Sequence, residues 1–154
     1  MENFSRLADC FDLLKKRKLH IAFAESCTGG LCAKALTDLA GASEVIEASL
    51  VSYSNRIKIE KLGVSPKTIE NYTEVSSECA LEMARGVRAF ASAEVGASLT
   101  GYAGPTGKDI GLVFVAVSSP DGERVEELHL SGTREEIRAA AANRCFELIY
   151  GIFK

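Results

Sequence analysis

This 154-residue sequence has few features of a metal site or a nucleic-acid-binding surface. It has only two histidines, His20 and His129, which lie far apart, and its five cysteines form no CxxC pair. We therefore expect no metal site, and we expect most of the scattered cysteines to be reduced residues of the core. A formal net charge of −3 argues against a nucleic-acid partner, because phosphate backbones attract basic surfaces.

The sequence also lacks an apolar run long enough to cross a membrane, and its N-terminus has no signal-peptide core. From these absences we expect a cytoplasmic protein with no membrane partner. Residues 3–17 instead space their apolar side chains like an amphipathic helix. The length suits one ordinary domain, so we predict a single domain over residues 1–154.

Segments with helical and with strand-like patterns alternate along the chain. We expect strands over residues 19–24, 45–52, 95–100, 112–118 and 124–130, the last two joined by a hairpin at Asp121-Gly122. We expect helices over 3–17, 29–39 and 54–62, and further helices that begin at Ser65, Ser76 and Thr133. The long helix after Ser76 should bury one face, made of Ala80, Met83, Ala84, Val87 and Phe90. This alternation predicts an α/β fold, a three-layer α/β/α sandwich whose sheet is mostly parallel with one antiparallel strand.

Three polar corners follow predicted strands of the sheet. They are ESCTGG after the first strand, SYSNRIK after the second and TGYAGPTGKD after the third. Open α/β sheets form their sites at the carboxyl ends of the strands. We therefore expect the three corners to converge on one cleft.

The first corner does not match any common phosphate-binding or nucleophile motif. It is neither a Walker A loop nor a GxGxxG fingerprint, and it lacks the glycines of a GxSxG elbow. Ser26 stands at the mouth of a helix whose first N–H groups are free to stabilise a developing anion. Two interpretations stay open: Ser26 is a nucleophile, or Ser26 or Thr28 only caps the helix. Cys27 is a weaker candidate because the chain has no histidine signature to activate it.

The second corner contributes Lys58, on a short predicted helix with Ile57 and Ile59 beside it. A lysine acts as a base only when it is neutral, and burial lowers its pKa by removing water from the charged form. Ser26 and Lys58 could then act together without a histidine. The alternative is an ordinary solvated lysine, as Lys61 on the same helix is expected to be.

Four motifs in this order are similar to the CinA C-terminal domain family. They are AESCTGGLCAKALTDLAGAS, SYSNRIKIEKLGV, EVSSECALEMARGVR and TGYAGPTG. Known members of this family include stand-alone nicotinamide mononucleotide deamidases of the PncC type. The resemblance implies a three-layer α/β/α fold and an amidohydrolase that converts nicotinamide mononucleotide to the acid and ammonia without a cofactor. It also implies a serine–lysine dyad, which falls on Ser26 and Lys58.

The same resemblance places contacts to a pyridine nucleotide on Tyr53, Thr100 and Arg134, and we add Thr28 and Gly29 of the first corner. Tyr53 could stack on a pyridinium ring, and Thr100 could bind phosphate or the attacking serine. Arg134 matches the geometry of a phosphate. The alternatives are a half-buried strand tyrosine, a strand-end hydroxyl and a surface arginine paired with a nearby acid.

The loop after Pro105 departs from the family pattern. It is several residues shorter than usual and lacks the Lys-Pro-Val-Gly that normally precedes the next strand. Two further functions therefore stay open: an amidase for another small substrate, and a non-catalytic nucleotide-binding or interaction module. The apolar end of the last helix, LIYGIFK, is a candidate surface for a homo-oligomer.

Overall fold

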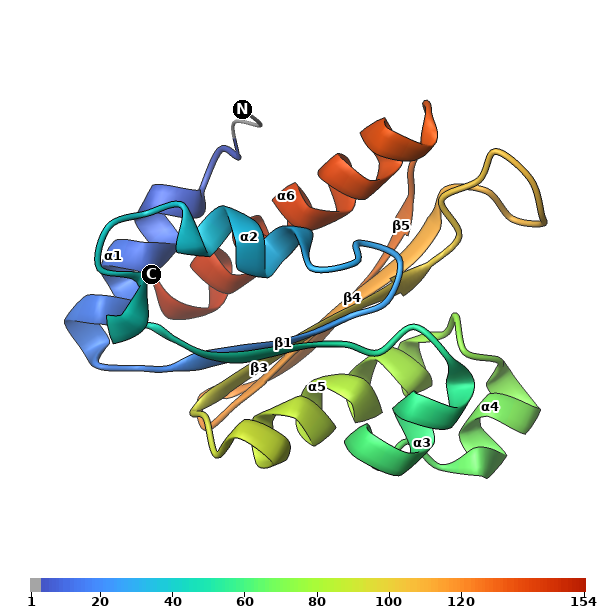
Figure 1. The fold of residues 1–154 in the computed structure, drawn as a ribbon, viewed down its shortest axis with the longest axis horizontal. Coiled ribbons are helices and arrows are strands. Elements are labelled where there is room, and N and C mark those ends of the chain that lie inside the picture. Colours follow the sequence, from blue (N-terminus) through green and yellow to red (C-terminus); the bar gives the residue numbers. More distant parts are fainter. Residues whose placement is uncertain (1–3) are drawn as a thin grey trace.

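The computed structural model describes residues 4–154, which form a five-stranded sheet between two layers of helices (Figure 1). The strands are β1 (Ile21–Glu25), β2 (Ile46–Val51), β3 (Val95–Gly101), β4 (Leu112–Ser119) and β5 (Gly122–His129), in the order β2-β1-β3-β4-β5. β1 pairs in parallel with β2 and β3, whereas β4 is antiparallel to both β3 and β5. β4 therefore runs against the other four strands. The predicted three-layer sandwich with one antiparallel strand is confirmed.

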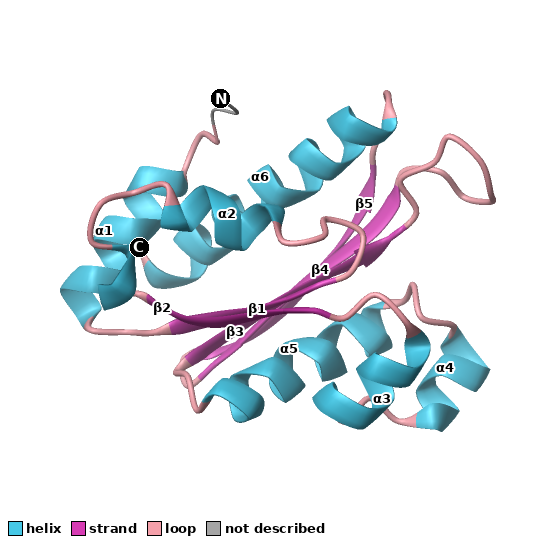
Figure 2. Ribbon diagram, viewed as in Figure 1, coloured by secondary structure: helices cyan, strands magenta, loops and turns pink. Residues whose placement is uncertain are grey.

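Helices cover both faces of the sheet (Figure 2). One layer holds α1 (Leu7–Arg17), α2 (Leu31–Thr37) and α6 (Arg134–Phe153). The other holds α3 (Asn55–Leu62), α4 (Pro66–Tyr72) and α5 (Ser77–Ala91), and a short 3-10 helix, η1 (Ala42–Glu44), leads into β2. The first helix was expected from Asn3, which lies outside the described residues, and its regular part begins at Leu7.

Polar caps fix where most helices begin, as the sequence predicted. The hydroxyls of Ser54, Ser65 and Ser76 each accept a hydrogen bond from a backbone N–H in the first turn of α3, α4 and α5. Thr133 forms a full capping box with Glu136 at the start of α6. The predicted hairpin at Asp121-Gly122 joins β4 and β5.

The core lies on both faces of β1 and β3, whose apolar side chains are buried. Phe146 of α6 contacts Phe23 of β1, with 6.3 Å between the ring centroids. All five cysteines are buried and free, which confirms their predicted place in the core. Phe90 corrects the prediction for α5, because its side chain is 56% exposed. It lies in the last turn, at the margin of the buried face, where Ala91 packs against the core instead.

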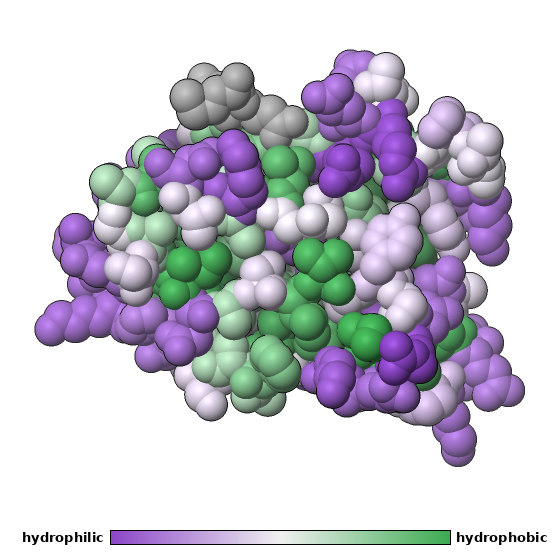
Figure 3. All heavy atoms as spheres, viewed as in Figure 1, coloured by the Kyte–Doolittle hydropathy of each residue, from purple (hydrophilic) through white to green (hydrophobic). Residues whose placement is uncertain are grey.

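Figure 3 shows one face of the molecule in the view of Figure 1. Apolar side chains gather across the middle of this face and are surrounded by hydrophilic ones. Val51 at the end of β2 is 48% exposed, and the residues of β2 alternate between half-buried and exposed. One side of this strand therefore remains in contact with water.

The apolar end of α6 is part of the chain's own core. Leu148, Ile149 and Phe153 are all buried, whereas Tyr150 and Ile152 are partly exposed, and a homo-oligomer that uses this end of α6 stays a prediction. In residues 4–154, no helix combines the length and the apolar character that crossing a membrane requires.

Candidate active site

A cleft of about 310 Å³ opens at the carboxyl ends of β1, β2 and β3. Ser26 lines it from the corner after β1, Tyr53 and Lys58 from the corner after β2, and Thr100 from the end of β3. The predicted convergence of three polar corners is confirmed. The volume is within the range of small-molecule sites.

Ser26 and Lys58 are in direct contact at the floor of this cleft. The Nζ atom of Lys58 lies 3.2 Å from the Oγ atom of Ser26. It also donates a hydrogen bond of 2.9 Å to the backbone carbonyl of Tyr53. Ser54 caps the N-terminus of α3, one turn before Lys58. From this position on the helix, the Lys58 side chain reaches Ser26 in the turn after β1. The amine of Lys58 is therefore held by two oxygen atoms.

Burial changes the pKa values of the Lys58 amine and the Cys27 thiol in opposite directions. Lys58 is 1% exposed, and burial lowers the pKa of its amine below the usual 10.5. Lys61, on the same helix, is exposed, as predicted. Burial raises the pKa of the neighbouring Cys27 thiol to about 12. The lysine is thus shifted toward the neutral form of a base, whereas the cysteine is shifted away from the thiolate form of a nucleophile.

The three residues expected to contact a substrate also line the cleft. The side chain of Tyr53 is 62% exposed and stands at the rim. Thr100 is buried, and its hydroxyl donates a hydrogen bond of 2.7 Å to the backbone carbonyl of Glu74. Arg134 is exposed at the start of α6, and its guanidinium donates to the carbonyl of Gly104 in the loop after β3. This contact ties the short loop to α6.

Thr28 and Gly29 lie outside the residues that line the cleft. The Thr28 side chain is fully buried, and its hydroxyl donates a hydrogen bond of 2.8 Å to the carboxylate of Glu25. Gly29 has a φ of +61°, and a Cβ atom there would lie 3.2 Å from the guanidinium of Arg138. The Thr28 side chain and the Gly29 backbone thus support the conformation of the turn, and a direct substrate contact by these two residues stays a prediction.

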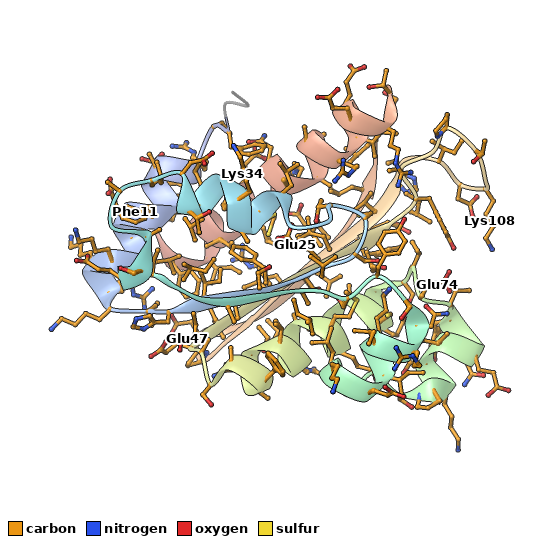
Figure 4. All side chains as sticks on the ribbon, viewed as in Figure 1. Phe11, Glu25, Lys34, Glu47, Glu74 and Lys108 are labelled. Atoms are coloured by element: carbon orange, nitrogen blue, oxygen red, sulfur yellow. The ribbon has the colours of Figure 1, made fainter. Side chains whose placement is uncertain are left out.

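Glu25 occupies the end of α2 that we had expected to stabilise an anion beside Ser26 (Figure 4). This carboxylate is fully buried, and it accepts hydrogen bonds from the N–H groups of Cys32 and Ala33 at 2.8 and 3.1 Å. The expected role of the α2 terminus is therefore wrong, since its donors already hold a negative charge. Neither Ser26 nor Thr28 caps this helix, whose N-cap is Gly30.

Two backbone N–H groups of the turn after β1, those of Cys27 and Thr28, remain available for an anion. In the hydrogen bonds of residues 4–154, neither Cys27 nor Thr28 donates its backbone N–H to a carbonyl. Arg138 of α6 holds the other side of this turn, and it donates to the carbonyls of Cys27 and Thr28, both at 2.9 Å. Because the N–H and C=O of a trans peptide point in opposite directions, Arg138 directs the Thr28 N–H away from itself.

Three charged residues of this region had no role in the sequence-based prediction. Glu25 is visible in the ESCTGG motif, but nothing in the motif shows which donors it meets. Arg138 lies one helical turn after Arg134, which was the only signal for it. Glu74 lines the cleft just before α5, and no motif in the sequence singled it out. Within the described part of the chain, no group of three histidine, cysteine or acidic side chains could hold a metal ion.

Comparison of the sequence with known proteins identifies the family to which the chain is related. The model of the CinA C-terminal domain matches residues 4–153. A putative competence-damage inducible protein of Acetivibrio thermocellus is 47% identical over 141 residues, which are 89% of this chain and 34% of that protein. A CinA-like protein of Fervidobacterium nodosum is 41% identical over 149 residues, 94% of this chain and 36% of that protein. The chain thus spans about a third of the length of these curated relatives.

Solved structures agree with this comparison. The competence/damage inducible protein CihA of Agrobacterium tumefaciens has a TM-score of 0.91 and 32% identity, with all of both chains covered. A competence-damaged protein (CinA) superfamily protein of Escherichia coli has a TM-score of 0.87 and 31% identity, covering 95% of this chain and 86% of that one. The fold, the motifs and these matches lead to one conclusion: this chain belongs to the CinA C-terminal domain family.

Proposed function

We propose that this chain is an amidohydrolase that converts nicotinamide mononucleotide to nicotinic acid mononucleotide and ammonia. The contact between the Lys58 amine and the Ser26 hydroxyl is the observation that carries this proposal. A buried lysine beside a serine, at the floor of a cleft of small-molecule size, is the arrangement that a serine–lysine hydrolase needs. Turnover of a free nucleotide would place the protein in the cytoplasm.

The contacts of Lys58 support its role as the base. In its neutral form the amine has two hydrogens and one lone pair. One hydrogen is bound by the Tyr53 carbonyl at 2.9 Å, which leaves the lone pair free to accept the proton of Ser26. The lowered pKa of Lys58 increases the fraction of this neutral form.

The reaction would then proceed in two steps. Ser26 Oγ attacks the carboxamide carbon while its proton passes to Lys58, and the C–N bond breaks as ammonia leaves with that proton. A water molecule next attacks the ester on Ser26, again with Lys58 as the base. This releases the carboxylic acid and restores the hydroxyl. The N–H groups of Cys27 and Thr28 are the free backbone donors closest in sequence to Ser26, and they would stabilise the developing oxyanion.

The residues at the mouth of the cleft suit a pyridine nucleotide. Arg134 is the exposed cation that could bind the phosphate, and the ring of Tyr53 at the rim could stack on the pyridine ring. The hydroxyl of Thr100 donates to the backbone carbonyl of Glu74, so its lone pairs remain for a substrate donor.

One assay tests the proposal. The purified protein is incubated with nicotinamide mononucleotide, and released ammonia is measured against a sample of the Ser26→Ala variant. We expect release from the wild type alone. Binding of the nucleotide without ammonia release would instead show a non-catalytic nucleotide-binding module, and would refute the proposed activity.

A further inference from the structure

Glu74 places in the cleft a carboxylate that has no hydrogen-bond or ion-pair partner among residues 4–154. It lies in the loop between α4 and α5 (Figure 4), where its half-buried side chain lines the cleft. Its backbone carbonyl accepts the hydroxyl of Thr100, which fixes the residue at the end of β3. In the hydrogen bonds and ion pairs of residues 4–154, the Glu74 carboxylate takes part in none. A half-buried charge of this kind is available to a ligand.

Among the described residues that line the cleft, three side chains carry charge, namely Lys58, Glu74 and Arg134. If Lys58 is neutral when it acts as the base, one anion and one cation remain. Glu74 precedes α5 and Arg134 begins α6, and these two helices cover opposite faces of the sheet (Figure 1). The cleft therefore has a negative side chain from one helical layer and a positive one from the other. This matches a ligand that is itself a zwitterion.

We propose that Glu74 makes the site selective for an amide on a cationic, N-substituted pyridinium ring over an amide on a neutral ring. Arg134 would bind the anionic end of the same ligand. The inference rests on the proposed function only in its choice of a nicotinamide ring. The preference of the cleft for a cation beside Glu74 does not depend on the proposed function.

The charge of Glu74 also affects the protonation of Lys58, so the preference for a cationic ring bears on catalysis as well as on binding. Burial has the larger effect on the pKa of Lys58 and lowers it, and three nearby groups oppose this effect through negative charge: Cys79 of α5, Glu74, and Cys27 of the turn. Because burial raises the pKa of both thiols, only the Glu74 carboxylate carries that charge near neutral pH. A free Glu74 carboxylate thus favours the protonated lysine, which cannot act as a base. A bound pyridinium would offset that charge and favour the neutral lysine. Binding of a cationic ring and activation of the base would therefore support each other.

The test compares two small ligands without phosphate, so that only the ring is varied. 1-Methylnicotinamide, methylated on the ring nitrogen, is a cation, whereas nicotinamide is neutral, and the affinity of the whole chain for each is measured by NMR titration. We expect the wild type to prefer the cation and Glu74→Gln to lower that preference by about fivefold, the effect of one partly solvated charge pair. Glu74→Asp should retain the preference, which controls for damage to the loop.

Glu70→Gln is the matched control, because Glu70 is an exposed acid of α4 that does not line the cleft. It should leave the preference unchanged. Equal affinity of the wild type for the two ligands, binding of neither, or an unchanged preference in Glu74→Gln would overturn the inference. Because binding needs no hydrolysis, a cation preference without ammonia release would refute the proposed function alone. Ammonia release without that preference would refute this inference alone.

Discussion

The amine of Lys58 lies 3.2 Å from the hydroxyl of Ser26 and is also bound by the backbone carbonyl of Tyr53. The two side chains are 32 residues apart in the sequence. They meet because β1 and β2 are parallel neighbours whose carboxyl ends open to the same edge of the sheet. The contact thus depends on the sheet topology as much as on either residue.

The pH dependence of activity should follow Lys58. Burial lowers the pKa of its amine below 10.5, and a base is active above its pKa. We therefore expect kcat/KM to rise with pH through a midpoint below 10.5 and then to reach a plateau. A pH–rate profile checks this. A midpoint at the pKa of a solvated lysine would contradict the role given to burial.

Arg134→Ala should weaken binding of the mononucleotide only moderately. Because Arg134 is exposed, its pairing with a phosphate is screened by water, and we expect KM to rise about fivefold, or about 1 kcal/mol. Steady-state kinetics with the mononucleotide and the riboside check this, since the riboside has no phosphate to lose. Equal losses on both substrates would show that Arg134 supports α6 or the loop instead. No loss on either would make it an ordinary surface arginine.

Removal of divalent cations should leave the activity intact. In the proposed mechanism Lys58 accepts the proton and backbone N–H groups face the oxyanion, so no step requires a metal ion. Activity is measured before and after dialysis against EDTA. A protein that becomes inactive and recovers with zinc or manganese would contradict this mechanism.

Glu25→Ala should destabilise the fold strongly. The substitution leaves the buried hydroxyl of Thr28 and the N–H groups of Cys32 and Ala33 without an acceptor. We expect a loss of about 2–4 kcal/mol in the free energy of unfolding, measured by urea denaturation. Ser49→Ala is the control, because this hydroxyl reaches Glu25 only at 3.3 Å from the exposed edge strand and should cost less than about 1 kcal/mol. Similar stabilities of the two variants would refute this role of Glu25.

The sequence was sufficient for features that depend on neighbouring residues. The caps by Ser54, Ser65, Ser76 and Thr133 follow from local hydrogen bonds, and the order of helices and strands follows from apolar periodicity. Because three strands run in the same direction, the convergence of their polar corners could also be predicted. Only the sheet topology, and not atomic detail, was needed for that step.

Features that depend on distant contacts could not be predicted in this way. Arg138 binds the carbonyl of Thr28 from 110 residues away, and no local pattern links the two. Helix α2 begins at Leu31, so its first donors face Glu25 and not Ser26, although all these residues belong to one short segment. The spacing of Phe90 is that of a core residue, yet its side chain lies at the exposed margin of α5.

The most direct test of the serine–lysine assignment compares ammonia release by Ser26→Ala, Lys58→Met and the double variant with that of the wild type. We expect each single substitution to lower kcat on the order of 10³-fold or more, and the double variant to be no worse, because the two groups act as one unit. Lys61→Met and Cys27→Ala are the controls and should stay active, since Lys61 is solvated and burial raises the pKa of the Cys27 thiol to about 12. Near-normal turnover by Ser26→Ala together with an inactive Cys27→Ala would contradict the account.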